Sequence, residues 1–305
     1  MNHLVTVLMP CYREPLDYFD RAVNSILQQT YKNIELLIIL DDPQNLVLRE
    51  AGENYQRKDS RVSFHVNPEN LKLTKTLNRG IKIANGDVIA RLDADDIALK
   101  TRISTQIKYV DEYDLISSNF ALINEAGSIV RHRTFPSDHQ SIYKYLIENA
   151  DCMYHTTWLG RKETFEALHG YREIGPFEDY DFLLRGLSHN MKFYNCAEEL
   201  NLYRINTQGI SSNNKIWQHL GSEYIREHYK EIEKIGPLDI EKYINSATGK
   251  KHTESYQEFY KFVSIFYQSK NSTDYYKNLL RYGPFLACCN YYGRKKVLAK
   301  LRELF

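Results

Sequence analysis

The chain has 305 residues, of which 43% are hydrophobic, and its 40 Lys and Arg nearly balance 39 Asp and Glu at a net charge of +1. This composition is typical of a globular protein and excludes a disordered or low-complexity chain. No apolar run is long enough to span a membrane, and charged residues interrupt the apolar core that a signal peptide needs. Five cysteines without a Cys-x-x-Cys spacing argue against a disulfide framework or a zinc site. We therefore expect a cytoplasmic protein.

The front of the chain alternates short apolar runs with amphipathic stretches. Buried strands are expected over Leu4–Met9, Glu35–Leu40, Val62–Val66 and Val88–Leu92. Helices are expected between them, over Leu16–Gln29, Asn45–Gln56 and Leu73–Ala84. Strands that alternate with helices in this way predict a mostly parallel, Rossmann-like central sheet flanked by helices.

After about residue 115 the pattern becomes mixed α/β. Short strands are expected over Leu115–Asn119, Ser128–Arg133, Thr156–Gly160, Met191–Cys196 and Leu200–Arg204. Helices are expected over Lys162–Leu168 and Tyr180–Leu187. From Asn213 onward strand signals fade, and the spacing predicts a helical C-terminal extension.

Three carboxylates follow the fourth expected strand, in Asp93-Ala94-Asp95-Asp96. Taken alone, such a cluster is as often exposed loop charge. Its position after a buried strand favours function, because ligands of open α/β sheets bind beyond the carboxyl ends of the strands. Closely spaced oxygen ligands suit a hard divalent cation, which in turn suits a diphosphate. No Gly-x-Gly-x-x-Gly follows the first strand and no Gly-Lys-Ser/Thr occurs, so dinucleotide-binding and P-loop proteins lose support.

Six sequence blocks occur in an order that chance rarely produces. They are Met9-Pro10-Cys11-Tyr12-Arg13-Glu14, Ser25-Ile26-Leu27-Gln28-Gln29-Thr30, Ile38-Ile39-Leu40-Asp41-Asp42, Leu77-Asn78-Arg79-Gly80-Ile81, Arg91-Leu92-Asp93-Ala94-Asp95-Asp96 and Glu178-Asp179-Tyr180-Asp181-Phe182-Leu183-Leu184-Arg185. Together they resemble the family 2 glycosyltransferases over residues 3–210. The resemblance implies an inverting enzyme with the GT-A fold. Its catalytic domain would span residues 1–212, with a nucleotide-sugar-binding half over 1–98 and an acceptor-binding half over 99–212, before the helical extension over 213–305.

The resemblance also implies a metal site and a catalytic base. Asp95 is expected to bind Mn²⁺ or Mg²⁺ directly, with Asp93 close by, so that the metal neutralises the leaving diphosphate. Asp179 is expected to take the proton from the acceptor hydroxyl, while Glu178 orients it or binds the acceptor. A simpler interpretation is that Glu178 and Asp179 are first-turn acids favoured by the helix dipole.

Nucleotide recognition is implied at the first two strand ends. Asp42 matches the family position that accepts the uracil N3–H, and Pro10 with Tyr12 matches the wall beside the base. Pro43-Gln44 replaces the usual Gly-Ser after Asp42, which stiffens this loop. Further residues that the resemblance implies in binding the nucleotide sugar are Glu14, Lys75, Arg79, Asp93 and Arg204. Lys75 and Arg79 fit equally well as solvated helix charges.

The C-terminal segment 281–305 combines six Lys and Arg with aromatic and aliphatic side chains against one acid, Glu303. This pattern fits an interfacial helix on an anionic membrane, where each basic residue contributes about 1 kcal/mol. It fits equally a helix packed on the catalytic domain with a solvated basic face. No RNA- or DNA-binding motif accompanies it, so no nucleic-acid partner is expected.

These features predict transfer of one hexose or N-acetylhexosamine from a nucleotide-diphosphate sugar, with UDP-galactose as the best single guess. The acceptor would be a glycan or an undecaprenyl-diphosphate-linked oligosaccharide in surface polysaccharide synthesis, reached in the cytoplasm or at the inner face of its membrane. Two alternatives stay open. A sugar-nucleotide pyrophosphorylase builds a similar carboxylate–metal–diphosphate site, although the Met9–Glu14 loop lacks the glycines of those enzymes. The other is a non-catalytic glycan- or nucleotide-binding module.

Overall fold

The computed structural model describes residues 2–149, 151–205, 215–246 and 248–257. Within these residues the chain forms two compact units: one holds the residues up to 205 with 225–234, and the other holds 215–224 with those from 235 on. The domain boundary predicted near residue 212 stays a prediction, because residues 206–214 lie outside the described part. Segment 281–305, to which the expected membrane contact belongs, also lies outside it.

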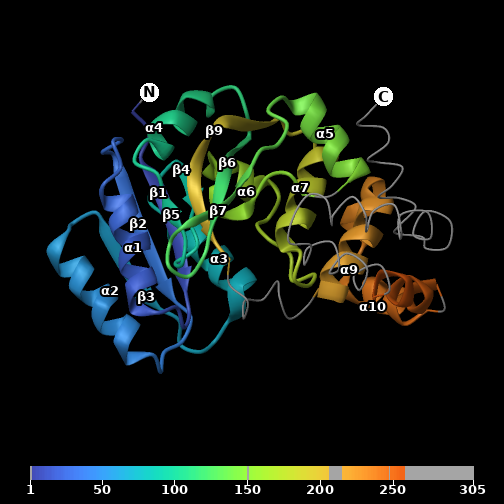
Figure 1. Ribbon diagram of the computed structural model, residues 1–305, viewed down its shortest axis with the longest axis horizontal. Coiled ribbons are helices and arrows are strands. Elements are labelled where there is room, and N and C mark those ends of the chain that lie inside the picture. The colour runs from blue at the N-terminus through green and yellow to red at the C-terminus, as the bar shows by residue number, and fades with distance from the viewer. Residues whose placement is uncertain (1, 150, 206–214, 247, 258–305) are drawn as a thin grey trace, which may run out of the picture. The chain divides into compact units, whose positions relative to one another are not determined.

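The first unit begins with four parallel strands in the order β3-β2-β1-β4 (Figure 1). These strands are β1 (Val5–Cys11), β2 (Ile34–Leu40), β3 (Val62–Val66) and β4 (Val88–Arg91). The helices that connect them are α1 (Leu16–Leu27), α2 (Leu46–Lys58) and α3 (Lys72–Ile83). Every residue of β1 and β2 is buried, as expected of parallel strands covered on both faces. The alternating sheet predicted for this half is confirmed.

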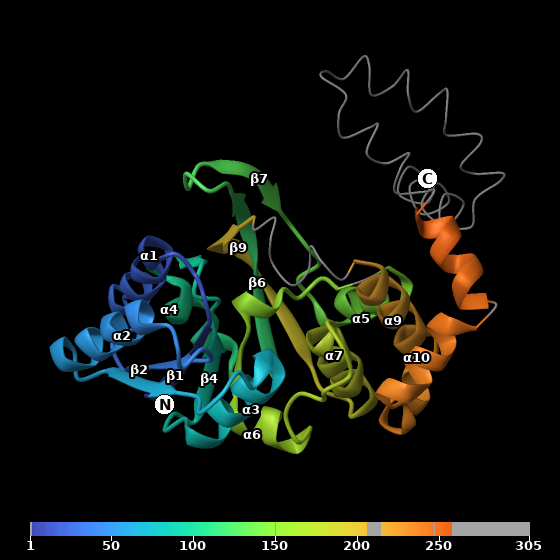
Figure 2. The same cartoon turned by 90° about the horizontal axis from the view of Figure 1, so that it is seen from below.

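The two faces of β1 are covered by different helices, with α1 and α2 on one face and α3 on the other (Figure 2). Met9 shares a hydrophobic core with Phe19 of α1. Leu8 points the other way and meets α3 at Gly80, where an added Cβ would come within 2.3 Å of the Leu8 side chain. The glycine therefore lets α3 approach β1 closely.

Five more strands extend this sheet on the β4 side in the order β4-β8-β6-β9-β5, with β7 paired to β6. They are β5 (Ile97–Ala98), β6 (Leu115–Ile123), β7 (Ile129–Arg133), β8 (Leu159–Arg161) and β9 (Phe193–Arg204). The helices of this part are α4 (Arg102–Gln106), η1 (Ile107–Tyr109), α5 (His139–Glu148), η2 (His155–Thr157), α6 (Lys162–Ala167) and α7 (Glu178–Ser188). Strands β6 and β9 form a long parallel ladder, whereas β8 is antiparallel to both β4 and β6.

Two strand predictions in this part were wrong. The segments Met191–Cys196 and Leu200–Arg204 are one strand, β9, whose register with β6 shifts after Cys196 because Ala197 and Glu198 bulge out of the ladder. The amide of Asn119 donates to the carbonyl of Ala197 at 2.8 Å, which satisfies the bulged backbone. A polar break in an apolar pattern was thus a bulge within a strand.

The strand expected over Thr156–Gly160 begins only at Leu159. Before it, residues His155–Thr157 form one 3₁₀ turn. The Thr157 hydroxyl donates to the carbonyl of Tyr154 at 2.7 Å and lies 2.5 Å from the Ser117 hydroxyl. These local hydrogen bonds compete with strand pairing, which explains the late start.

The described residues from 215 on are helical, as expected. They form α9 (Lys215–Glu227), η3 (Tyr229–Lys234) and α10 (Pro237–Asn245). Among the described residues, no helix combines the length and the apolar character that a membrane crossing requires.

Candidate active site

The carboxyl ends of β1, β2 and β4 meet at one edge of the sheet, because the three strands are parallel. Several predicted binding residues follow these strand ends directly: Tyr12 and Glu14 after β1, Asp42 after β2, and Asp93 and Asp95 after β4. The first turn of α7 faces the same place, since the charges of Asp93 and Arg91 act on its Glu178 carboxyl. The structure therefore brings the two ends of the predicted site together.

The two carboxylates after β4 differ in their partners. Asp93 Oδ1 lies 2.7 Å from Nη2 of the buried Arg91, and its backbone N–H donates to the Thr156 hydroxyl. Asp95 forms no ion pair and accepts from no other side chain within the described residues. Burial raises the pKa of Asp95 to about 6, and the charge of Asp93 adds to this rise. A cation beside Asp95 would relieve this repulsion.

Glu14 adds a third negative group to this corner. Burial raises the pKa of Glu14 to about 7, and the charges of Asp95 and Asp93 add to this rise. The backbone N–H of Tyr12, which donates to the Glu14 carboxyl at 2.7 Å, opposes it. No group of three His, Cys, Asp or Glu side chains has metal-binding geometry among the described residues. A metal on Asp93 and Asp95 would therefore take its remaining ligands from a substrate, as the oxygens of a diphosphate allow.

Arg204, the last residue of β9, fixes this corner in place. Its backbone N–H donates to Asp96, its Nε donates to the carbonyl of Asp95 at 2.9 Å, and its Nη1 donates to the carbonyls of Asn124 and Glu125. Its Nη2 has no hydrogen-bond partner in the described chain. Arg204 is thus mainly an anchor of the Asp95 loop, with one nitrogen, Nη2, left for a ligand.

The end of β2 carries an ion pair at the predicted uracil position. Arg13 Nε lies 2.8 Å from Asp42 Oδ2, and its guanidinium lies over the Tyr12 ring. The hydrogen bond from Arg13 lowers the pKa of Asp42, so this carboxylate stays ionised and accepts hydrogen bonds at neutral pH. Arg13 is 66% exposed, so the ion pair lies at the surface. Pro10 lies within β1, where every residue is buried.

Asp41, next to the predicted uracil position, and the predicted binding residue Arg79 have structural partners. Asp41 accepts from the Asn67 amide at 2.6 Å and from the backbone N–H of Leu71, which fixes the start of α3. Arg79 donates to the carbonyl of Val66 and to the Asn67 side chain. Arg79 is therefore tied to the end of β3.

Lys75 lies farther along the surface. It pairs with Glu173 at 3.3 Å, and both side chains are more than half exposed. The structure thus does not bring Lys75 against another predicted site residue.

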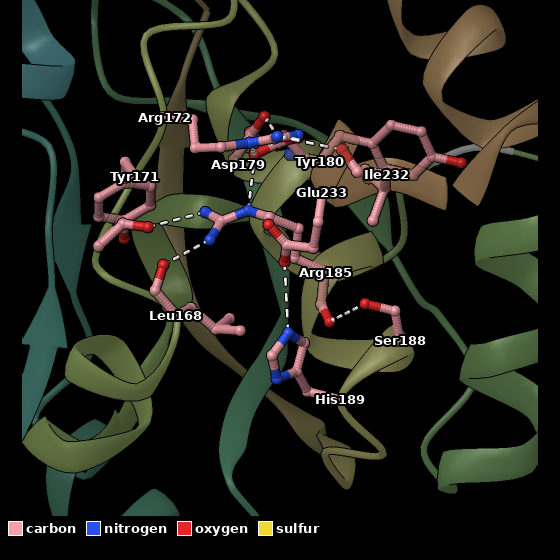
Figure 3. A network of polar contacts seen from close by, with 12 residues as sticks. Leu168, Tyr171, Arg172, Asp179, Tyr180, Arg185, Ser188, His189, Ile232 and Glu233 are labelled. Atoms are coloured by element: carbon pink, nitrogen blue, oxygen red, sulfur yellow. Dashed lines mark hydrogen bonds and ion pairs between the residues drawn. The ribbon is translucent and has the colours of Figure 1, made fainter. Parts of the chain in front are cut away.

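Buried ion pairs hold the loop in front of α7 (Figure 3). Asp181 is fully buried and binds both Arg172 and Arg185, the latter at 2.9 Å. Arg185 also donates to the carbonyls of Leu168 and Gly170 at 2.5 and 2.7 Å. Because these contacts fix the chain on both sides of residues 173–177, the first turn of α7 is held in one position. Asp181 and Arg185 are four residues apart and pair along α7.

Glu178 and Asp179, at the start of α7, are adjacent carboxyls in a dry environment. Burial raises the pKa of Glu178 to about 8, and the charge of Asp179 adds to this effect. Burial also raises the pKa of Asp179, although the charge of Arg91 opposes this. At neutral pH Glu178 therefore keeps its proton, so it adds no second negative charge beside Asp179, the predicted base.

Sequence reasoning missed two residues here. Burial and the charge of Asp179 raise the pKa of Asp151, which places Asp151 beside the predicted base. A lone acid in a loop gives no sequence signal of this contact. Arg91 was part of a matched block but had no role assigned. Its signal was a charged residue at the end of a buried strand, where charges occur only with a partner.

Comparisons with known proteins agree with this geometry. The family model "Glycosyl transferase family 2" matches residues 6–168. An uncharacterized glycosyltransferase of Methanocaldococcus jannaschii is 33% identical over 74% of this chain and 80% of its own. The O-antigen biosynthesis glycosyltransferase WbnJ of Escherichia coli is 29% identical over 74% of this chain and 89% of its own. The UDP-Glc:alpha-D-GlcNAc-diphosphoundecaprenol beta-1,3-glucosyltransferase WfgD of Escherichia coli is 29% identical over 70% of this chain and 81% of its own.

Solved structures share the fold at low sequence identity. A mannosyltransferase from Pyrobaculum calidifontis in complex with GDP-Man and Mn²⁺ superposes with a TM-score of 0.60 at 14% identity, covering 99% of this chain and 87% of that one. TarS of S. aureus in complex with UDP-GlcNAc gives 0.59 at 14% identity, covering 93% and 80%. With a family model matched over more than half of its length and these neighbours in fold, the chain belongs to glycosyltransferase family 2 and has the GT-A fold.

Proposed function

We propose that this glycosyltransferase builds a surface polysaccharide by transferring one hexose or N-acetylhexosamine, with inversion, from a UDP-sugar. UDP-galactose is our best single candidate donor. The observation that supports the proposal most is the placement of Asp95 and Asp93 at the end of β4, facing Asp179 at the start of α7. Two relatives support the pathway and acceptor, since one is named for O-antigen biosynthesis and the other for a diphosphoundecaprenol-linked acceptor. Family membership argues against a sugar-nucleotide pyrophosphorylase.

The donor would bind at the strand ends. Asp42, whose ionised state the ion pair with Arg13 maintains, would accept the uracil N3–H, and Tyr12 would flank the base. Asp95 and Asp93 would hold Mn²⁺ or Mg²⁺, which stabilises the negative charge of the leaving diphosphate. The free Nη2 of Arg204 lies beside the same loop and would donate to the diphosphate.

Asp179 would act on the acceptor. It takes the proton of an acceptor hydroxyl while that oxygen bonds to the anomeric carbon and the bond from this carbon to the diphosphate oxygen breaks. Attack opposite the leaving group inverts the anomeric centre, so an α-linked donor gives a β-linked product. Glu178, protonated at neutral pH, would donate a hydrogen bond to the acceptor without adding a second charge.

The acceptor would reach this site from the inner leaflet of the cytoplasmic membrane. The basic and aromatic residues of segment 281–305 support a peripheral contact with anionic lipid there. This part of the proposal rests on the sequence alone.

A donor panel tests the proposed function. UDP-galactose, UDP-glucose, UDP-N-acetylgalactosamine, UDP-N-acetylglucosamine and GDP-mannose are each incubated with the enzyme and Mn²⁺, with and without EDTA, and nucleotide release is measured. We expect release from one UDP-sugar that stops with EDTA and accelerates when a lipid-linked glycan acceptor is added. No nucleotide binding or release from any donor would overturn the proposal and favour a non-catalytic module.

A further inference from the structure

Arg91 carries hydrogen-bond donors that the described chain leaves unused. Its side chain is only 3% exposed, and Nη2 holds Asp93 at 2.7 Å. Its Nε and Nη1 have no hydrogen-bond partner within the described residues. A guanidinium keeps its charge and all five N–H donors, and buried donors nearly always have a partner. These atoms therefore require an acceptor from outside the described chain.

Arg185 shows what a purely structural arginine looks like in the same protein. It is as deeply buried as Arg91, at 2% exposure. Its Nε binds Asp181, its Nη1 donates to the carbonyl of Leu168 and its Nη2 donates to the carbonyl of Gly170. All three nitrogens are thus engaged with the protein, whereas in Arg91 only one is.

The position of Arg91 indicates what its free donors meet. It ends β4, two residues before Asp93, and its charge acts on the carboxyls of Glu178 and Asp179 at the start of α7. Arg91 therefore lies close to both the proposed metal ligand and the proposed base. In the proposed reaction the anomeric carbon would lie near both groups, with its diphosphate on one side and the attacking hydroxyl on the other. The oxygens nearest to Arg91 would then be hydroxyls of the donor sugar.

We propose that Arg91 binds a hydroxyl group of the transferred sugar through a free N–H of Nε or Nη1 while its Nη2 holds Asp93. This assignment rests on the proposed function and adds a residue that selects the sugar rather than the nucleotide. A hydroxyl oxygen accepts from such a charged donor without a charge of its own. The bound sugar would thereby be coupled to the orientation of Asp93.

The test compares UDP with the UDP-sugar that the donor panel selects, both in Mn²⁺. Affinities are measured by calorimetry for the wild type, for Arg91→Lys and for Arg185→Lys, together with donor analogues that each lack one sugar hydroxyl. Lysine keeps a cation near Asp93 but lacks the Nε and Nη1 donors of the guanidinium. In the wild type, removal of the one hydroxyl that Arg91 binds should weaken the donor by about tenfold or more, the worth of a hydrogen bond from a charged group. In Arg91→Lys this penalty should fall to about twofold, with UDP affinity nearly unchanged.

Arg185→Lys is the matched control, because it removes an equally buried guanidinium whose three nitrogens all have protein partners. It should lower the melting temperature and keep the full hydroxyl penalty. If Arg91→Lys also keeps the full penalty, or if no hydroxyl removal weakens the wild type, Arg91 does not bind the sugar and water satisfies its free donors. The circular dichroism spectrum of Arg91→Lys shows whether this variant folds. If it does not fold, Arg91→Gln, which still offers an N–H group, is measured in its place and judged by the same criterion. Wild-type enzyme that binds none of the donors would overturn the proposed function itself, and this assignment with it.

Discussion

Two groups of carboxyls in this protein meet at one site and differ in their ion pairing. The strand-end cluster (Glu14, Asp42, Asp93 and Asp95) contains two acids with arginine partners, since Asp42 pairs with Arg13 and Asp93 with Arg91. None of the helix-start cluster (Asp151, Glu178 and Asp179) forms an ion pair within the described residues, and burial raises the pKa of each.

This difference indicates two kinds of chemistry. Ion-paired carboxylates stay charged and suit the recognition of a base or a cation, as proposed for Asp42 and Asp93. Unpaired buried carboxyls have raised pKa values and suit proton transfer. Asp95 stands apart, because it belongs to the strand-end cluster but has no arginine, and a divalent cation would be its missing partner.

The largest effect should come from Asp95→Ala. This change removes the one strand-end carboxylate that would bind the metal and has no protein partner among the described residues. Because several kcal/mol of charge stabilisation on the leaving group are lost with the metal, the rate of transfer should fall by about 10³-fold or more. Mn²⁺-dependent UDP binding, measured by calorimetry, should disappear while the melting temperature holds. Asp17→Ala, an exposed acid on α1, is the control. Full activity of Asp95→Ala in EDTA would show that no metal acts there.

The next effect separates the two acids of the helix-start cluster. Asp179→Asn keeps the shape and removes the proton acceptor, so donor binding should survive while turnover falls by roughly 10²–10⁴-fold. Glu178→Gln keeps a hydrogen-bond donor like the protonated acid and should cost far less. Steady-state kinetics of both variants decides the matter, since an inactive Glu178→Gln beside an active Asp179→Asn would reverse the assignment.

The raised pKa of Glu178 predicts a stability difference that grows with pH. In the unfolded chain Glu178 loses its proton at a pH of about 4.3, whereas in the folded protein it keeps the proton up to a pH of about 8. Rising pH between these values therefore favours the unfolded chain, because only the unfolded state releases the proton. Glu178→Gln should melt higher than the wild type at pH 8, and the gap should close toward pH 5. Parallel melting curves across this range would contradict the buried, protonated carboxyl.

The smallest and most conditional effect concerns segment 281–305. If it lies on anionic lipid, its removal should release the enzyme from anionic vesicles, and binding of the full chain should weaken with salt. Transfer to a membrane-embedded acceptor should then suffer more than transfer to a short soluble analogue. Co-sedimentation at low and high salt measures this, and absence of binding at low salt would contradict the membrane contact. A packed helix predicts instead a lower melting temperature and equal damage to both reactions.

The sequence was most informative where structure is local. Apolar runs of uniform burial, such as those of β1 and β2, predicted the elements of the parallel half to within two residues at each end. In the second half the bulge at Ala197 and Glu198 looked like a break, because the polar pair Glu198 and Glu199 gives the same pattern whether the strand stops or bulges there. The position of a strand end thus follows from periodicity, but its continuity depends on a distant partner.

The site shows the same limit at the level of side chains. Sequence blocks predicted which residues gather at the strand ends and at α7, since backbone topology decides that. They did not predict that Arg204 would donate hydrogen bonds to backbone carbonyls, or that Lys75 would pair with Glu173. They also did not predict that Arg91 would keep N–H donors without a partner in the described chain. Each of these depends on which residue, far away in the chain, lies within about 3 Å of a charged group.

The anomeric configuration of the product tests the account most directly. The account places one base, Asp179, opposite a leaving diphosphate held by Asp95 and Asp93, and a single displacement in that geometry must invert the anomeric carbon. With the α-linked UDP-sugar that the donor panel selects, the anomeric proton coupling in the NMR spectrum of the product should be that of a β-linkage. A product that keeps the α configuration would contradict the central claim, because retention requires a second displacement or attack from the side of the leaving group, and a base opposite the diphosphate provides neither.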